Sequence, residues 1–241
     1  MAQMFDPAND PRTVDELLLE ALTETDDEVA WQPVAALHYR GSREVLDRAY
    51  SLCVSECSFE RRLGADILGQ LGVSRRTFPR ECRTILLSML QGEHNTDILQ
   101  AVLIAISHNE WPEVVSHALP FVIHPDPAVR HAAVLALTGH EEQAAIECLI
   151  RLSRDSDSDV RDWATFGLGS QCDLDTPQIR DALAARLDDT DDDTRHEAIV
   201  GLARRQDRRA IAAVGRELSS DCVSSLVLEA ADLLGLPHVD V

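Results

Sequence analysis

His196 and Glu197, which stand side by side in the stretch TRHEAIVGL, are the residues of this sequence best suited to metal chemistry. An imidazole and a carboxylate are both ligands for iron and other transition metals. A working metal site needs several such side chains, converging from separate parts of the chain. The other adjacent pair, His140 and Glu141, stands at a different offset within the chain's repeated pattern. We therefore predict no metal site and no cofactor.

Motifs for nucleophilic or phosphate chemistry are missing from the sequence. It contains no GxSxG turn, no phosphate-binding GxxxxGK[ST] loop and no HExxH pair. Six cysteines are spread along the chain without a CxxC pair, which favours reduced thiols in a cytoplasmic protein. The first residues, MAQMFDPAND, do not resemble a secretory signal. We expect a non-enzymatic protein with no catalytic residues.

The charge balance argues against two classes of partner. The chain has 42 acidic residues against 22 basic ones, a formal net charge of −20, and every Lys or Arg is Arg. Proteins bind nucleic acids by neutralising phosphates with Lys and Arg, and anionic membranes attract the same side chains. We therefore expect neither nucleic acid nor membrane as a partner. The oligomeric state is not predicted.

A recurring phrase predicts the elements that carry these residues. DSDVRDWATFGLG begins at Asp157 and DDDTRHEAIVGLA begins at Asp191. Each contains an Arg, a small Ala three residues later and a Leu seven residues later. The corresponding anchor positions along the chain are 30, 61, 99, 130, 161, 195 and 227. Such regular self-similarity is typical of a repeat protein.

Each repeat is predicted to be a pair of helices. Apolar residues recur at helical spacing after every anchor, and a second amphipathic stretch precedes each anchor. No segment alternates with the period of a strand. One helical hairpin cannot bury its apolar face alone, so neighbouring hairpins must stack. We predict an all-α, right-handed α-solenoid of about seven antiparallel helical hairpins.

The recurring phrase resembles that of HEAT-like repeats of the phycobilisome-lyase type, whose second helix opens with Asp-x-x-Val-Arg-x-x-Ala-x-x-x-Leu-Gly. DSDVRDWATFGLG matches every position, and DPAVRHAAVLAL matches all but the final Gly. The resemblance implies one solenoid over residues 13–236, with an extension at 1–12 and a tail at 237–241. It says little about function, because members of this group include scaffolds, adaptors and a few enzymes.

The anchor arginines have two interpretations. In HEAT-like proteins this Arg usually pairs with an acid of the preceding turn, as Asp159 with Arg161 or Asp193 with Arg195 would here. Unpaired, the arginines would instead offer a basic ladder to a ligand. We favour the first interpretation.

The positions one and two residues after each anchor face the concave groove in this architecture. Trp and Arg are over-represented at binding hot spots, so these positions are candidates for partner binding. Trp31 and Trp163, which stand at such positions, are equally compatible with packing between repeats. The predicted groove residues are Trp31, Arg62, Gln100, His131, Asp162, Trp163, His196 and Glu197.

Runs of acids fall in the turns between paired helices, at 24–28, 155–159 and 188–193. One Asp is enough to cap a helix, yet residues 188–193 supply five acids in six positions. We predict that the two C-terminal runs merge into an acidic ridge that attracts a basic partner. The ridge consists of Asp155, Asp157, Asp159, Asp188, Asp189, Asp191, Asp192 and Asp193.

These features favour a protein-binding scaffold or adaptor with a basic protein as partner. A narrower alternative is an immunity or antitoxin protein that neutralises a basic toxin such as a nuclease. Three enzymatic alternatives follow from the resemblance: a bilin lyase, a di-iron enzyme like deoxyhypusine hydroxylase, and an alkylpurine DNA glycosylase. No set of residues supports a bilin lyase. A di-iron enzyme needs several His and carboxylate ligands, whereas this sequence has one His-Glu pair at the required offset. A DNA glycosylase needs a basic groove, whereas this chain is strongly acidic.

Overall fold

The chain folds into helices joined by short turns. The computed structural model describes residues 5–24, 26–109, 111, 113–220 and 222–237. Those residues form fourteen α-helices and three short 3₁₀ helices, with no strand among them, so the predicted all-α fold class is confirmed. No helix in this described part has the length and apolar character needed to cross a bilayer.

Contacts between Cα atoms divide the helices into two compact units, Met1–Val114 and Val115–Val241. We call them the N-terminal and C-terminal units. The prediction of one continuous solenoid over residues 13–236 stays a prediction. Residues 1–4 of the predicted extension and 238–241 of the predicted tail lie outside the described residues.

The N-terminal unit contains three helical hairpins. They pair α1 with α2, α3 with α4, and α5 with α6. The 3₁₀ helix η1 (Pro7–Asn9) precedes them and packs on α2. The bounds of the helices are α1 (Val14–Thr23), α2 (Asp27–Arg40), α3 (Arg43–Cys53), α4 (Ser58–Gly69), α5 (Pro79–Gly92) and α6 (Thr96–Ser107).

The C-terminal unit contains four further hairpins. The first pairs η2, which continues the short helix α7, with α8; α9 then pairs with α10, α11 with α12, and α13 with α14. The bounds are α7 (Val114–Ala118), η2 (Leu119–Ile123), α8 (Pro127–Leu137), α9 (Gln143–Leu152), α10 (Ser158–Gly169), α11 (Pro177–Ala184), α12 (Asp192–Arg204), η3 (Arg208–Ala210), α13 (Ile211–Glu217) and α14 (Ser225–Leu233).

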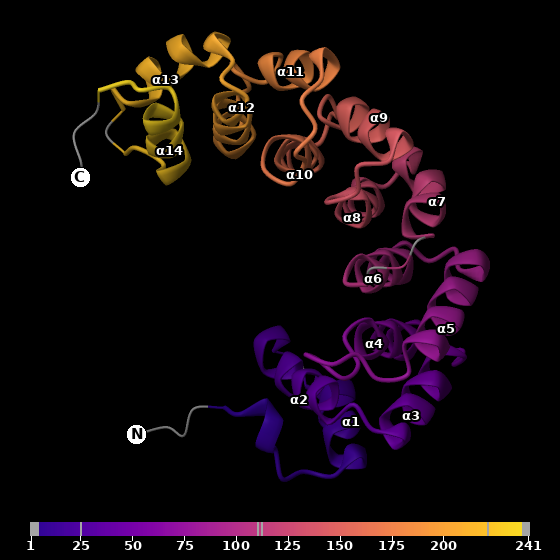
Figure 1. The fold of residues 1–241 in the computed structure, drawn as a ribbon. Coiled ribbons are helices and arrows are strands. Elements are labelled where there is room, and N and C mark those ends of the chain that lie inside the picture. The colour runs from indigo at the N-terminus through magenta and orange to yellow at the C-terminus, as the bar shows by residue number, and fades with distance from the viewer. Residues whose placement is uncertain (1–4, 25, 110, 112, 221, 238–241) are drawn as a thin grey trace. The chain divides into compact units, whose positions relative to one another are not determined.

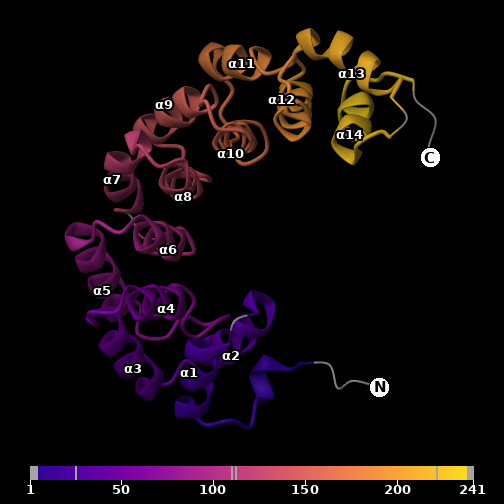
Figure 2. The same ribbon diagram turned by 180° about the vertical axis from the view of Figure 1, so that it is seen from behind.

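Each unit has two layers of helices (Figures 1 and 2). The even-numbered helices pack on one another in sequence: α4 contacts α2 and α6 in the N-terminal unit, and in the C-terminal unit α10 contacts α8 and α12, which contacts α14. We call this layer of each unit the inner layer and the layer of odd-numbered helices the outer layer. All seven anchor positions lie on inner-layer helices, as the repeat predicts.

The repeated Ala and Leu form the core between the layers. Ala133, Ala164 and Ala198, each three residues after an anchor, are fully buried. The residues seven after the first six anchors are also buried, and burying one such Leu contributes about 1.5–3 kcal/mol. The last position, Leu234, is only half-buried. The recurring phrase is therefore a packing pattern.

Aspartate side chains cap the start of α10 and α12. The side chains of Asp157 and Asp191 accept hydrogen bonds from the backbone N–H groups of Val160 and Thr194, at 3.2 and 2.9 Å. Such a cap satisfies an amide that has no partner within the helix, and the carboxylate also complements the helix dipole. One acid in each turn is therefore explained by helix initiation.

Proline interrupts one predicted helix. The stretch VVSHALPFVI is amphipathic throughout, but α7 ends at Ala118 and the chain continues as the 3₁₀ helix η2 with Pro120 in its first turn. Proline has no N–H to donate, and its ring clashes with the carbonyl of the preceding turn. The first half of this hairpin is consequently less regular than the others.

Two glycines allow α10 and α12 to pack closely. A Cβ atom placed on Gly201 would lie 2.6 Å from the Cα atom of Gly169, and one placed on Gly169 would lie 2.9 Å from the carbonyl oxygen of Glu197. Real Cβ atoms do not approach backbone this closely, so an alanine at either position must push the helices apart. The spacing of the inner layer at this point depends on both glycines.

We predict that Gly201→Ala lowers the free energy of unfolding by about 1–3 kcal/mol, the usual cost of overpacking. The matched control is Gly215→Ala, also in a helix, where a Cβ atom would meet nothing within 4 Å. Alanine is the better helix former, so the control should gain up to about 1 kcal/mol. Urea unfolding measures both, and equal effects of the two substitutions would contradict the close-packing argument.

Candidate functional site

Four anchor arginines link each repeat to the one that follows. Arg130 donates to both carboxylate oxygens of Asp155, at 2.8 and 2.7 Å, and Arg161 donates to both of Asp189, at 3.2 and 3.1 Å. In each pair the acid follows the outer-layer helix of the next repeat. The same arrangement joins Arg61 to Glu93 and Arg195 to Glu217. We call these four pairs the arginine ladder.

The ladder arginines also bind the turn before their own helix. The Nη1 atom of Arg161 donates to the carbonyl oxygens of Asp155 and Ser156, at 3.0 and 3.2 Å. Arg61 and Arg130 bind the carbonyls six and five residues earlier in the same way. Each of these arginines therefore fixes its own turn and the next repeat together.

The prediction of which acids pair with the anchor arginines is wrong. Pairing of Arg161 with Asp159, or of Arg195 with Asp193, is not observed, and neither acid makes a hydrogen bond or ion pair with any described residue. The arginine side chains run across to the next repeat, where the carboxylate is shielded from water. A fork of guanidinium N–H groups matches such a carboxylate in two parallel bonds. The broader prediction, that these arginines pair with acids of the chain, is confirmed for the four ladder arginines.

Some acids of the predicted ridge are bound by ladder arginines and are shielded from solvent. The side chains of Asp155 and Asp189 are only 11% and 5% exposed and accept from arginine, while Asp157 and Asp191 cap helices. Asp188 and Asp192 are well exposed and pair with Arg216 and Arg195. Asp159 and Asp193 remain as exposed acids that make no such contact in the described structure. Of the 24–28 run, residue 25 and the side chains of 27 and 28 lie outside the described residues.

The predicted groove residues of the N-terminal unit lie on its inner-layer helices. Trp31 is 48% exposed and meets the ring of His38 edge to face, with the ring centroids 5.8 Å apart. Arg62 is exposed and lies 3.9 Å from Asp66, whereas Gln100 is half-buried. Trp31 and Arg62 line one pocket of about 250 Å³ together with Phe59 and Asp66. The structure thus brings two of these three residues together.

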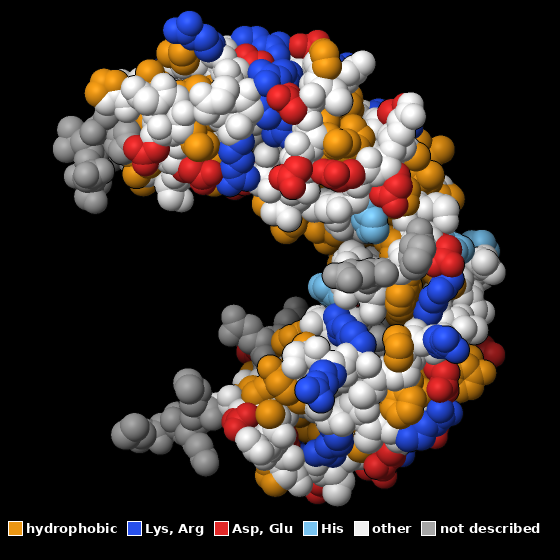
Figure 3. All heavy atoms as spheres, in the orientation of Figure 1, with side chains coloured by type: hydrophobic (Ala, Val, Ile, Leu, Met, Phe, Trp, Pro, Cys, Tyr) orange, Lys and Arg blue, Asp and Glu red, His pale blue; other side chains and the backbone are white. Residues whose placement is uncertain are grey.

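The predicted groove residues of the C-terminal unit gather on α8, α10 and α12. Trp163 is 37% exposed and stacks edge to face against His131 and Phe166, at centroid distances of 5.7 and 5.4 Å. Asp162, Trp163, Phe166 and Glu197 line a pocket of about 220 Å³. Figure 3 shows acidic side chains gathered over α10 on the face in view. Phe166 was missed, although it stands one helical turn after Trp163.

His196 and Glu197 are held by different partners. The Nε2 atom of His196 lies 3.2 Å from Glu217, which also accepts from Arg195. Glu197 instead accepts a 2.7 Å hydrogen bond from the hydroxyl of Ser170. Among the described residues, no three His, Cys, Asp or Glu side chains form a group suited to a metal ion. The six cysteines are free thiols.

Two carboxyl groups in the pocket of the C-terminal unit are unusually hard to ionise. Burial, together with the surrounding carboxylates of Asp193, Glu197, Asp191 and Asp159, raises the pKa of Asp162 to about 7. One oxygen of Asp162 is shielded from solvent and has no hydrogen-bond partner. Burial also raises the pKa of Glu197, against the hydrogen bond from Ser170. Arg204 also lowers the pKa of Glu197, but its guanidinium is paired with Glu229.

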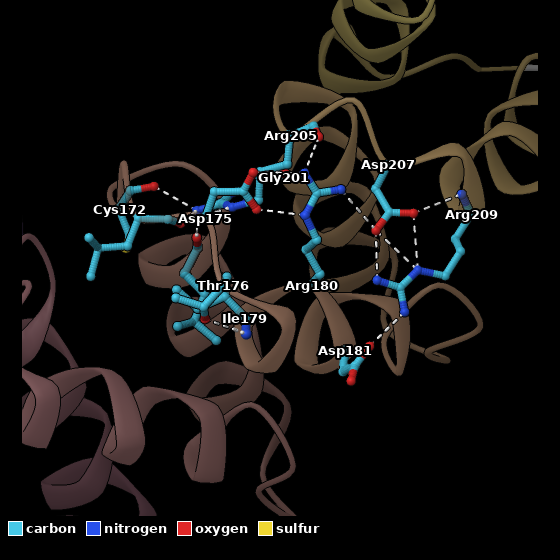
Figure 4. A network of polar contacts seen from close by, with 12 residues as sticks. Cys172, Asp175, Thr176, Ile179, Arg180, Asp181, Gly201, Arg205, Asp207 and Arg209 are labelled. Atoms are coloured by element: carbon cyan, nitrogen blue, oxygen red, sulfur yellow. Dashed lines mark hydrogen bonds and ion pairs between the residues drawn. The ribbon is translucent and has the colours of Figure 1, made fainter.

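A buried arginine stabilises the turn between α10 and α11 (Figure 4). Arg205 is only 8% exposed and donates to the carbonyl oxygens at the end of α10 and in the following turn. These carbonyls have no partner within the helix, so the guanidinium satisfies them. Arg180 donates to the carbonyl of Arg205 and to both oxygens of Asp175. Nothing in the repeated pattern distinguishes Arg205 from its neighbour Arg204.

The comparisons with known proteins agree with this architecture. The HEAT repeats family matches residues 84–169 and 149–235. Because these matches span more than half of the chain, the protein belongs to the HEAT repeats family. The matches concern HEAT repeats as a whole and do not separate out the phycobilisome-lyase type.

One relative is similar over most of its length. Protein YibA of Escherichia coli strain K12 is 28% identical over 218 residues, which cover 85% of this chain and 76% of YibA. The X-ray structure of E. coli YibA superimposes with a TM-score of 0.78 at 26% identity, covering 93% of this chain and 82% of that one. An archaeal HEAT-like repeats protein from Thermococcus onnurineus NA1 shares the fold alone, with a TM-score of 0.54 at 14% identity over 94% and 97% of the chains.

We predict that Arg130→Met destabilises the protein by about 2–4 kcal/mol, because it leaves the shielded carboxylate of Asp155 without its cation. Arg151→Met is the matched control, since Arg151 is exposed and makes no hydrogen bond or ion pair among the described residues. The control should change stability by less than about 0.5 kcal/mol. Urea unfolding followed by circular dichroism distinguishes them, and comparable losses would show that the ladder adds nothing beyond an ordinary surface arginine.

Asp162 gives a pH-dependent prediction. Its pKa is about 7 in the folded chain against an ordinary value of 3.8, so the folded protein binds a proton that the unfolded chain releases. Stability is consequently lost as the pH rises from about 4 to above 7. Asp162→Asn cannot ionise and should raise the melting temperature at about pH 8, with the gain shrinking towards pH 5. Asp159→Asn, an exposed acid on the same helix, should show no such gain.

Proposed function

We propose that this HEAT-repeat protein is a non-enzymatic, protein-binding scaffold or adaptor whose partner has a basic surface. The observation that carries the proposal is the surface of the C-terminal unit around Trp163. There an exposed aromatic ring lines a pocket with the carboxyl groups of Asp162 and Glu197, and the carboxylates of Asp159 and Asp193 act on Asp162. Trp is over-represented among the few residues that carry most of the binding energy of protein interfaces.

The arginine ladder supports this proposal because its arginines do not pair with the acids around Trp163. Arg130, Arg161 and Arg195 turn away to carboxylates of the next repeat, so they do not neutralise the acids around Trp163. Exposed acids of one sign attract a basic partner and raise its association rate more than its affinity. The acidic ridge is therefore proposed to act mainly through Asp159 and Asp193, beside the exposed acids Asp188 and Asp192, which are paired with Arg216 and Arg195.

The alternative of an immunity or antitoxin protein is a narrower form of the same proposal. It names the basic partner as a toxin, such as a nuclease, whose positive surface the acids would mask. The motivation is the net charge of −20 on a scaffold with no catalytic residues proposed. A cytoplasmic location agrees with six free thiols.

The test is affinity capture from the native cells, with the full chain as bait, in low salt and again at about 0.5 M salt, where exposed charges are screened. We expect a basic protein that is retained in low salt and released in high salt. Capture of no protein, or of a neutral partner indifferent to salt, would contradict the basic partner. Stoichiometric metal or pigment on the purified chain would contradict the non-enzymatic assignment.

A charge-matched pair of variants sharpens this prediction. The double variant Asp159→Asn, Asp193→Asn should slow association with the captured partner several-fold, because it removes two exposed charges that attract a basic surface. The control variant Glu44→Gln, Glu56→Gln has the same net charge but changes exposed acids of the N-terminal unit. Surface plasmon resonance measures both rates, and equal slowing would assign the effect to net charge instead of to this surface.

A further inference from the structure

The pocket between Trp163 and Glu197 has the composition of a cation site. Its lining consists of two aromatic rings, Trp163 and Phe166, and two carboxyl groups, Asp162 and Glu197. Aromatic faces attract cations through their quadrupole, and carboxylates do so by charge. The two rings meet edge to face at 5.4 Å, so a contact within the chain holds this wall of the pocket.

Among the described residues, no cation acts strongly on Asp162, and Arg204, whose charge lowers the pKa of Glu197, is itself paired with Glu229. The side chains that act most strongly on Asp162 are all acids, from its own helix α10 and from α12 and the turn before it. Its oxygen Oδ1 is shielded from water and without a hydrogen-bond partner. On α8, His131 borders Trp163, but burial lowers its pKa and so favours the neutral ring. A positively charged hydrogen-bond donor that enters the pocket would both offset the acidic charge and donate to its carboxyl groups.

The N-terminal unit offers an internal comparison. Its pocket of about 250 Å³ is also lined by two aromatic rings, Trp31 and Phe59, and by two acidic residues, Glu24 and Asp66. Burial raises the pKa of Asp66 to about 6, and Arg62, whose guanidinium lies 3.9 Å away, opposes this rise. In this unit the chain therefore supplies its own arginine to an aromatic and acidic pocket. The repeat position of Arg62 is occupied by Asp162 on α10 and by His196 on α12.

We propose that the pocket formed by Asp162, Trp163, Phe166 and Glu197 binds the guanidinium group of an arginine side chain of the partner protein. This inference rests on the proposed function and specifies which side chain of the basic partner is recognised. Arginine fits better than lysine, because its planar group stacks on an aromatic face and donates to two carboxylates at once. The exposed acids Asp159 and Asp193 would steer that side chain towards the pocket.

The experiment uses N-acetyl-arginine amide, titrated into the full-length ¹⁵N-labelled chain while the indole N–H signal of Trp163 is followed. N-acetyl-citrulline amide, which has nearly the same shape without the charge, is the control ligand, and N-acetyl-lysine amide tests the head group. We expect the arginine amide to shift the Trp163 signal with an affinity at least about tenfold above that of citrulline, the scale of one charge-assisted contact. Lysine should bind more weakly than arginine.

Variants locate the binding. The isosteric double variant Asp162→Asn, Glu197→Gln should weaken the arginine amide about tenfold or more, whereas Asp159→Asn outside the pocket should weaken it less than about threefold. A melting curve checks that each variant is folded. Equal binding of arginine and citrulline, equal binding of lysine, or an unaffected double variant would overturn the guanidinium assignment. If salt-sensitive capture of a basic protein persists in that case, the proposed function stands without this pocket.

Discussion

The structure depends on a bond between neighbouring repeats: an arginine at the start of an inner-layer helix holds a carboxylate that follows the next outer-layer helix. Arg130 with Asp155 and Arg161 with Asp189 show the bond in its bidentate form. The same guanidinium groups bind the carbonyls of their own turn. Apolar packing alone is non-directional, so these directional bonds help to set how one hairpin sits on the next.

This constraint also shapes the chemistry of the surface. The acids of the four ladder pairs are shielded from water, and the acids that cap helices are used locally. The exposed negative charge around α10 and α12 is therefore smaller than the composition implies. Asp162 shows the consequence, because burial and four nearby carboxylates raise its pKa to about 7. A folded protein that tolerates such an ionisable group is less stable at neutral pH than its packing would allow. A cationic ligand would relieve that cost.

Membership of the HEAT repeats family places the chain among proteins whose fold is shared by many functions. E. coli YibA, at 28% identity, shares the architecture over most of both chains. What distinguishes individual members is the set of residues on the exposed faces of the helices, since the core positions are set by stacking. In this chain we propose that Trp163 and the carboxyl groups beside it carry the function.

The sequence by itself determined the repeat, because a packing pattern such as Arg161, Ala164 and Leu168 recurs in helical register and needs no knowledge of distant contacts. It placed all seven inner-layer helices and singled out Trp31 and Trp163. The tertiary structure alone decided which acid each arginine binds, since Asp189 is 28 residues from Arg161 and becomes its neighbour only when hairpins stack. The same holds for Arg205, which only burial against the end of α10 distinguishes from Arg204. Local patterns reveal periodicity, whereas ion-pair partners and pKa shifts depend on distances across the stack.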